Sequence, residues 1–296
     1  MRRAGYRILK SDGTMDFCVH KTPLTPANYS ELTRLTSVVY DLQPTGIAYG
    51  VAEANHESIH AELSAQQLRF DSLFADEGDP VDCSCDCLLG LTCRVTNFLS
   101  AVSAFLDQTG HAAKRKMGAE SNAYDEWTSA RRNLYEERFS YRLLYQLRHY
   151  VQHYALPVSN IIVEGTRPEI GSNMVYEIGI RLQRDILLNG GFNWKHARTG
   201  IQSQPSEFDL LPLIDEHMNS IGILCRQYLE NFRDGISECE RYLDAFHRSY
   251  AVPKNAQAVV FVGESLNSDT PPGRQESIPV SQFRRIKTLL ESLPSR

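Results

Sequence analysis

The chain has 296 residues, of which 42% are hydrophobic and 23% are charged, and its formal net charge is −5 at pH 7. These proportions are typical of a globular protein, and the length allows one large domain or two modest ones. Proteins wholly committed to coating nucleic acid are usually basic, so the net charge argues against that class, although it is compatible with a local basic face.

Targeting and cysteine signals favour a cytoplasmic protein that does not bind membranes. No apolar run approaches the roughly 20 residues that a membrane-spanning helix needs. The basic N-terminus, residues 1–6, leads into no apolar signal core. The seven cysteines are an odd number, which does not suit the disulfide framework of a secreted protein.

The N-terminal region, residues 1–76, is predicted to be a small α+β module. A β-hairpin over 6–20 turns at a Ser-Asp-Gly sequence. Two helices, over 27–42 and 57–70, follow from apolar residues at helical spacing. Between them, the short apolar and glycine-flanked stretch 46–52 is predicted to be a strand or a buried turn.

The central region, residues 80–252, is predicted to be a helical bundle that carries a β-rich insertion at about 158–203. In the insertion, apolar residues alternate with polar or small ones, which is the period of a half-buried strand. Ser121 is expected to cap the longest helix. The predicted helical stretches are 82–108, 122–154 and 207–250, the last with a break near Asp234-Gly235 or with none.

The C-terminal region, residues 253–296, is predicted to contain a strand over 257–262, a loop over 265–277 and a helix over 281–293. The fold class is therefore mainly α, a helical bundle with a β-rich insertion, flanked by small α+β segments at both ends. The two terminal segments could also join into a single module.

Four cysteines cluster near the start of the central region: Cys83, Cys85, Cys87 and Cys93. Residues two apart on a helix point in different directions, so three thiolates at that spacing do not converge easily. Zinc sites more often use two pairs separated by a longer loop. We expect small apolar positions in a helix start, with a structural zinc or redox cluster as the alternative.

The stretch from Phe139 to His153 carries the sharpest motif, Arg148-His149 followed by His153, beside an apolar stripe at helical spacing. Arginine offers a fork of donors that suits a phosphate, and histidine can act as base or acid near neutrality. These groups suffice for metal-free RNA cleavage. A base takes the proton of the ribose 2′-OH, the oxygen attacks the adjacent phosphorus, and a cation stabilises the phosphorane.

This segment resembles the HEPN family, α-helical domains whose ribonuclease members carry an Arg, a polar residue and, a few residues further on, a His. The resemblance extends over about residues 82–250. It implies a dimeric bundle that cleaves RNA without metal or cofactor and is often a toxin or phage-defence component, with an antitoxin or regulatory protein as a partner. It also implies that Arg148 holds the phosphate, His153 is the base or acid and His149 supports them. Some of these toxins carry a Tyr two residues after the His, where this chain has Ala155.

The helix before the motif is locally basic. From His111 to His153 there are eight Lys or Arg residues and five acidic ones, which gives +3 in an acidic protein. We expect this strip to face RNA. The RNA-binding candidates are Arg131, Arg132, Arg138 and Arg142.

Two alternatives to a ribonuclease remain open. Residues five apart on an α-helix differ by roughly 140° in direction, so Arg148 and His153 do not share a face within one protomer. The first alternative is a non-catalytic HEPN-like module that binds RNA or a protein through the same face. The second is a metal site at His149 and His153. The other i,i+4 pair, His56 and His60, is expected on a solvated helix face.

Overall fold

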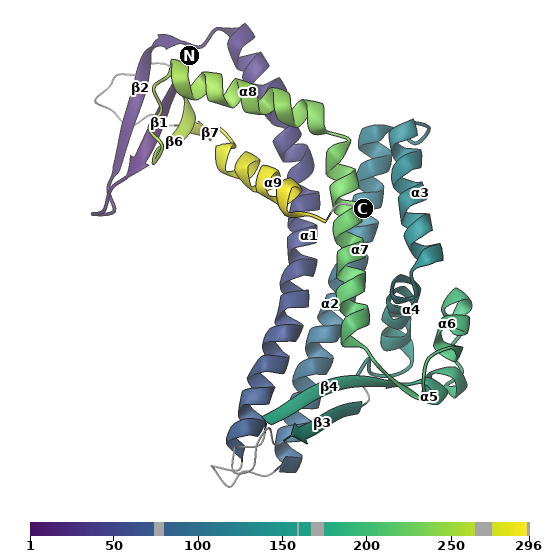
Figure 1. The fold of residues 1–296 in the computed structure, drawn as a ribbon. Coiled ribbons are helices and arrows are strands. Elements are labelled where there is room, and N and C mark those ends of the chain that lie inside the picture. The colour runs from purple at the N-terminus through teal and green to yellow at the C-terminus, as the bar shows by residue number, and fades with distance from the viewer. Residues whose placement is uncertain (74–79, 159, 167–174, 264–273, 295–296) are drawn as a thin grey trace. The chain divides into compact units, whose positions relative to one another are not determined.

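The computed structural model describes residues 1–73, 80–158, 160–166, 175–263 and 274–294. The described chain is mainly helical with two small antiparallel sheets, which confirms the predicted mainly α class (Figure 1). Its contacts define two units. One unit comprises Met1–Gly46 and Leu229–Leu293, and the other comprises Ile47–Tyr228 together with Pro294. The predicted division into segments 1–76, 80–252 and 253–296 stays a prediction.

The helices are α1 (Pro26–Leu73), α2 (Pro80–Met117), α3 (Asn122–Glu137), α4 (Phe139–His153), α5 (Arg184–Asn189), α6 (Arg198–Gln202), α7 (Leu211–Glu230), α8 (Arg233–Ser249) and α9 (Val280–Ser292), with a 3-10 turn, η1, at Lys195–Ala197. The strands are β1 (Arg2–Leu9), β2 (Met15–Pro23), β3 (Asn160–Thr166), β4 (Val175–Gln183), β5 (Glu207–Asp209), β6 (Gln257–Val262) and β7 (Arg274–Ser277). Helices α1 and α7 contribute to both units.

The first unit is built on a four-stranded antiparallel sheet in the order β2-β1-β6-β7. The predicted hairpin and the strand over 257–262 are confirmed. At the hairpin turn Gly13 has φ +82°, a left-handed conformation that glycine adopts without steric cost. Since β1 pairs with β6, the two terminal segments form one sheet, with Val259 and Phe261 fully buried in its core. Part of the predicted loop 265–277 is strand β7, and its residues 265–273 lie outside the described residues.

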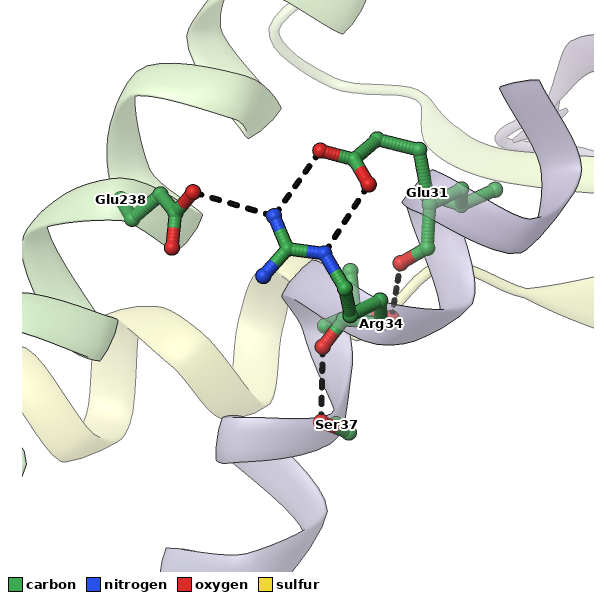
Figure 2. A network of polar contacts seen from close by, with 6 residues as sticks. Glu31, Arg34, Ser37 and Glu238 are labelled. Carbon is green, nitrogen blue, oxygen red and sulfur yellow. Dashed lines mark hydrogen bonds and ion pairs between the residues drawn. The ribbon is translucent and has the colours of Figure 1, made fainter. Parts of the chain in front are cut away.

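An arginine cluster links α1 to α8 within this unit (Figure 2). The Arg34 guanidinium donates to both carboxylate oxygens of Glu31, each at 2.9 Å, and to Glu238 on α8 at 3.0 Å. This pairing lowers the pKa of Glu31 and raises that of Arg34. All three side chains are about half exposed, so the cluster fixes local geometry and adds little to stability.

In the second unit α1 continues without a break, so the prediction of a strand or buried turn at 46–52 is wrong. The helix continues because its pattern of inward-facing residues extends well beyond this stretch. Seven positions spaced alternately three and four residues apart face inward along the helix. They are Tyr49, Ala52, His56, Ile59, Leu63, Gln66 and Phe70.

Helices α2, α3 and α4 pack on one another in this unit. The prediction of a single helix over 122–154 is wrong, because Arg138 has an extended backbone (φ −103°, ψ 121°) that ends α3 and begins α4 (Figure 1). The predicted cap is confirmed, since the Ser121 hydroxyl accepts from the backbone N–H of Tyr124 at 3.1 Å. Of the two alternatives for residues 207–250, the structure has the one with a break: α7 and α8 are separated at Asn231 and Phe232, just before the expected position near Asp234-Gly235.

The stretch 158–203, predicted to be β-rich, contains β3 and β4, which pair with β5 beyond it in a three-stranded antiparallel sheet of order β3-β4-β5. That this sheet is an insertion in a helical bundle stays a prediction. Four side chains of β4 are buried in alternation, as its sequence pattern predicts: Tyr176, Ile178, Ile180 and Leu182. Short helical segments, α5, η1 and α6, lie between β4 and β5.

Helix α2 contains a long apolar stretch. Its most apolar window of 18 residues, within Cys83–Met117, has a mean hydropathy of 1.3, so by length and composition the helix meets the requirement for a membrane span. The prediction that no segment approaches this requirement is therefore wrong. Core helices of globular proteins have the same profile, and 39% of the most apolar window is buried here, so the feature is weak evidence for a span.

Candidate functional site

A cavity of about 690 Å³ lies among α2, α3, α4 and η1, within the second unit. This volume is in the range of small-molecule and nucleotide sites. Its lining residues are Leu106, Asp107, Gly110, His111, Lys114, Tyr124, Trp127, Thr128, Arg131, Arg132, Tyr135, Tyr141, Tyr145, Gln146 and Lys195. On α2 and α3 these positions recur every three or four residues, so each helix presents one face to the cavity.

The cavity is lined by an excess of positive charge. Lys114, Arg131, Arg132 and Lys195 contribute four cations, whereas Asp107 is the single carboxylate. In the described part of the chain, none of these four cations forms an ion pair with a carboxylate. Unneutralised cations around a concave surface raise the local concentration of anions. The site is therefore suited to an anionic ligand.

Aromatic rings form the other component of the lining. Tyr124, Tyr135 and Tyr145 are half-buried, so part of each ring is open to a ligand. Trp127 is 1% exposed, and its indole Nε1 has no hydrogen-bond partner among the described residues. Burial raises the pKa of Tyr141 to about 12, and the nearby Arg131 guanidinium opposes this rise. The cavity thus combines cations with flat aromatic faces.

The structure separates the four predicted RNA-binding arginines into two pairs. Arg131 and Arg132 line the cavity. Arg138 instead donates to the Ser220 hydroxyl on α7 at 3.0 Å. Arg142 donates to the backbone carbonyls of residues 135 and 136, the first at 2.9 Å, at the end of α3. The second pair is therefore engaged in holding the helices together.

The motif residues Arg148, His149 and His153 lie in the last two turns of α4. Arg148 is half-buried, and its Nε donates to no acceptor in the part of the chain that the structure describes. His153 is exposed and is the last residue of the helix, which remains regular up to that point. Because the helix is regular, the angular offset between Arg148 and His153 persists within the protomer. Their catalytic assignment stays a prediction.

His149 is the motif residue that contacts a side chain of the cavity lining, although it does not line the cavity itself. Its ring packs edge-on against Tyr145, with centroids 5.6 Å apart. Burial, together with the positive charges of Arg148 and Lys195, lowers the pKa of His149. The imidazole is therefore mostly neutral at neutral pH, the form that can accept a proton.

Sequence reasoning missed a second polar cluster. His56 and His60 were predicted on a solvated helix face, but both bind one carboxylate oxygen of Asp215 on α7. The i,i+4 spacing of the histidines is visible in the sequence, whereas nothing in the sequence connects them to a residue more than 150 positions away. Among the described residues, this is the group that brings three potential metal ligands together.

The four clustered cysteines of α2 do not form such a group. Cys83 and Cys87 are buried, whereas Cys85 and Cys93 are exposed, and all four are free thiols. Their burial alternates as the helical geometry predicts, and this favours the interpretation of Cys83 and Cys87 as apolar core positions.

No protein-family model, curated protein sequence or solved structure matches this chain.

Proposed function

We propose that the protein binds single-stranded RNA, and that one nucleotide segment enters the cavity among α2, α3 and α4. The observation that carries this proposal is the lining itself, in which Lys114, Arg131, Arg132 and Lys195 pair with no carboxylate of the described residues and lie beside half-buried tyrosine rings. Phosphate neutralisation by lysine and arginine supplies most of the affinity of nucleic-acid binding proteins. Aromatic side chains add stacking on bases, which is worth roughly 1–3 kcal/mol per base.

Single-stranded RNA fits this site better than a duplex. A cavity of about 690 Å³ admits a base and its phosphate but not a double helix, whose bases are stacked and paired. The chain as a whole carries −5, so attraction of a polyanion has to come from a local region. The basic cavity provides that region.

On the basis of the HEPN resemblance, we extend the proposal to the fold. In the extended proposal, the helices of residues 82–250 form a HEPN-like bundle that carries the β3-β4-β5 sheet as an insertion. A homodimer would place a second copy of Arg148 and His153 opposite the first, and the protein would act in defence or as a toxin under the control of a partner protein. Light scattering on the purified chain tests the dimer, and a monomer at all concentrations would contradict this extension.

A second candidate function is cleavage of the bound RNA. The observation that favours it is the lowered pKa of His149 beside the cavity wall, which leaves the imidazole free to accept the proton of a ribose 2′-OH. The resulting alkoxide would attack the adjacent phosphorus and expel the 5′-oxygen of the next nucleotide, leaving a 2′,3′-cyclic phosphate. Arg148 and His153 would stabilise the phosphorane and protonate the leaving oxygen.

Binding is tested by fluorescence anisotropy with a short single-stranded RNA, the matching DNA and the RNA duplex. The double variant Arg131→Ala/Arg132→Ala removes two cavity cations. At about 1 kcal/mol for each charged contact in a partly exposed site, we expect a roughly 30-fold weaker Kd. The dependence of log K on log salt should also become less steep by about 1.4, since each phosphate contact on a single strand contributes about 0.7.

The matched control is Arg94→Ala. Arg94 is exposed on the same α2, about 18 Å from the cavity at 1.5 Å per residue, and it forms an ion pair with Glu62. It should leave the RNA affinity nearly unchanged. Equal weakening by Arg94→Ala and by the double variant would contradict the proposal, as would the absence of binding to any of the three ligands.

Cleavage is tested with the same single-stranded RNA in EDTA, comparing the wild-type protein with His149→Ala, His153→Ala and Arg148→Ala. Arg94→Ala, which lies outside both the cavity and the motif, is again the control variant. Loss of the cyclic-phosphate product in the motif variants at unchanged RNA affinity would support catalysis. Equal activity in all variants, or none in any, would leave the binding function alone.

A further inference from the structure

We propose that His56, His60 and Asp215 form a site for a Zn²⁺ ion, with a water molecule as the fourth ligand. The site is distinct from the cavity and does not depend on the proposed RNA-binding function. Its three side chains come from two helices of the second unit, α1 and α7. Histidine nitrogen and carboxylate oxygen are established zinc ligands, and three protein ligands with one open position are the arrangement of catalytic and exchangeable sites.

The two histidines are positioned by the helix. His56 and His60 are one turn apart on α1, so their rings lie on the same side. The Nε2 atoms point toward each other across 3.4 Å, and the ring planes are inclined by 72°. At a Zn–N bond of about 2.05 Å, two ligands of a tetrahedral zinc ion are roughly 3.3 Å apart. The observed separation already matches that edge.

The third ligand completes the triangle. Asp215 Oδ1 lies 2.7 Å from His56 Nε2 and 2.8 Å from His60 Nε2, and all three ligand atoms lie within 4.8 Å of one another. These two distances are hydrogen bonds, shorter than a tetrahedral edge by about 0.5 Å. The side chain of Asp215 is 45% exposed, so it can move outward by this amount when a cation enters.

Packing fixes the His56 side of the cluster, whereas the side formed by His60 and Asp215 is open to solvent. The His56 ring packs on fully buried Phe98, with centroids 5.9 Å apart, which fixes its orientation. The His60 side chain is 43% exposed, and together with Asp215 it leaves the solvent side accessible. An incoming ion therefore has an entry path and a place for a water ligand.

The ligand set also limits the metal. Two imidazoles and one carboxylate suit zinc and other first-row ions such as Co²⁺, whereas Mg²⁺ and Ca²⁺ prefer oxygen ligands alone. The ion would join α1 to α7 through side chains that are otherwise joined by hydrogen bonds. Binding to the folded chain alone then raises its stability by mass action.

The test uses the untagged full chain, stripped with a chelator, and titrates it calorimetrically with ZnCl₂ and in parallel with MgCl₂. We expect one Zn²⁺ per chain, no Mg²⁺ binding, and a Tm increase of about 5 °C at a hundredfold excess of Zn²⁺ over Kd. The variants His60→Gln and Asp215→Asn should each weaken Zn²⁺ binding roughly 100-fold or more, since even the loss of a residue that only hydrogen-bonds to a metal ligand costs 10–100-fold.

Two control variants separate this site from other donors. His111→Gln changes an exposed histidine on α2, a helix that supplies none of the three ligands. The double variant Cys85→Ser/Cys93→Ser removes the exposed thiols. Both should bind Zn²⁺ as the wild type does, and the Co²⁺ form should show a tetrahedral visible spectrum without a thiolate charge-transfer band. Because His60 and Asp215 are partly exposed, their variants should keep the wild-type circular dichroism. No Zn²⁺ binding, full affinity in His60→Gln, or loss of binding in the cysteine variant would overturn the proposal.

Discussion

Arg142 has a structural role, although it belongs to the same basic strip of the sequence as Arg131 and Arg132, which line the cavity proposed to bind RNA. Helix α3 ends at Glu137 because Arg138 is extended, which leaves the last carbonyls of α3 without helical partners. Arg142 donates from one guanidinium nitrogen to two of those carbonyls, on residues 135 and 136. Replacing it should therefore destabilise the junction of α3 and α4 without weakening RNA binding.

The magnitude follows from the two hydrogen bonds. A hydrogen bond to a charged group contributes roughly 1.5–3 kcal/mol, and both bonds here share one donor nitrogen on a half-buried side chain. For Arg142→Ala we therefore expect a loss of about 1.5 kcal/mol in the free energy of unfolding. This corresponds to a decrease of about 2.5 °C in Tm for a chain of this size. Arg142→Lys keeps the charge but not the planar donor group and should lose most of the same stability.

The assay is thermal unfolding followed by circular dichroism, with anisotropy on the single-stranded RNA in parallel. Arg198→Ala is the matched control, because Arg198 is exposed on α6 and makes no comparable hydrogen bond to another described residue. The double variant Arg131→Ala/Arg132→Ala should give the reverse pattern, with weaker RNA binding and a nearly unchanged Tm. An unchanged Tm in Arg142→Ala, or a loss of RNA affinity equal to that of the double variant, would refute this reasoning.

Three further predictions concern stability and thiol reactivity. A Cβ atom at Gly5 would lie 2.0 Å from a backbone oxygen of β2, so Gly5→Ala should destabilise the four-stranded sheet by about 1–3 kcal/mol in urea unfolding. Gly50 in α1 has open space around it, so the control Gly50→Ala should be neutral or stabilising. Burial lowers the pKa of His217 to about 3, so its neutral form stabilises the fold above about pH 6.5 and this contribution is lost as the pH falls toward 3. Unfolding midpoints measured across that range should therefore depend less on pH in His217→Leu, and an unchanged slope would contradict the assignment. Cys85 and Cys93 should react with a thiol reagent in the native protein, whereas the four buried cysteines should react only on unfolding, and uniform reactivity would argue against the described packing of α2.

The sequence predicts most helices and strands of this fold because their apolar periodicity is local. It fails where a local pattern competes with a longer one, as at 46–52, where Gly46 and Gly50 suggest a turn but the inward-facing positions of α1 continue through them. It fails also at Arg138, whose extended backbone follows from the packing of α3 and α4 and not from the residue itself. Local signals therefore specify the elements, and tertiary contacts specify where the helices are interrupted.

The candidate sites were predictable only in part, for a related reason. The basic strip indicates Arg131 and Arg132, but it does not separate them from Arg138 and Arg142, because that distinction depends on which carbonyls and hydroxyls each guanidinium meets. Lys195 also lines the cavity, but it belongs to a segment more than 40 residues beyond α4. Its backbone has φ +47°, a conformation that no pattern in the sequence indicates, so its place in the cavity could not be predicted.

The pairing of β1 with β6 has a consequence for synthesis of the chain. Arg7 pairs with Gln257, so 250 residues separate partners in the same sheet. At the 5–20 residues per second of translation, β1 waits roughly 12–50 s before its neighbour emerges. During that time the β1-β2 hairpin can form alone, with the inner edge of β1 unpaired, and an unpaired edge is open to strands of other chains. The first unit therefore folds last, and we expect it to be the part of the molecule that most needs protection from aggregation while the ribosome completes the chain.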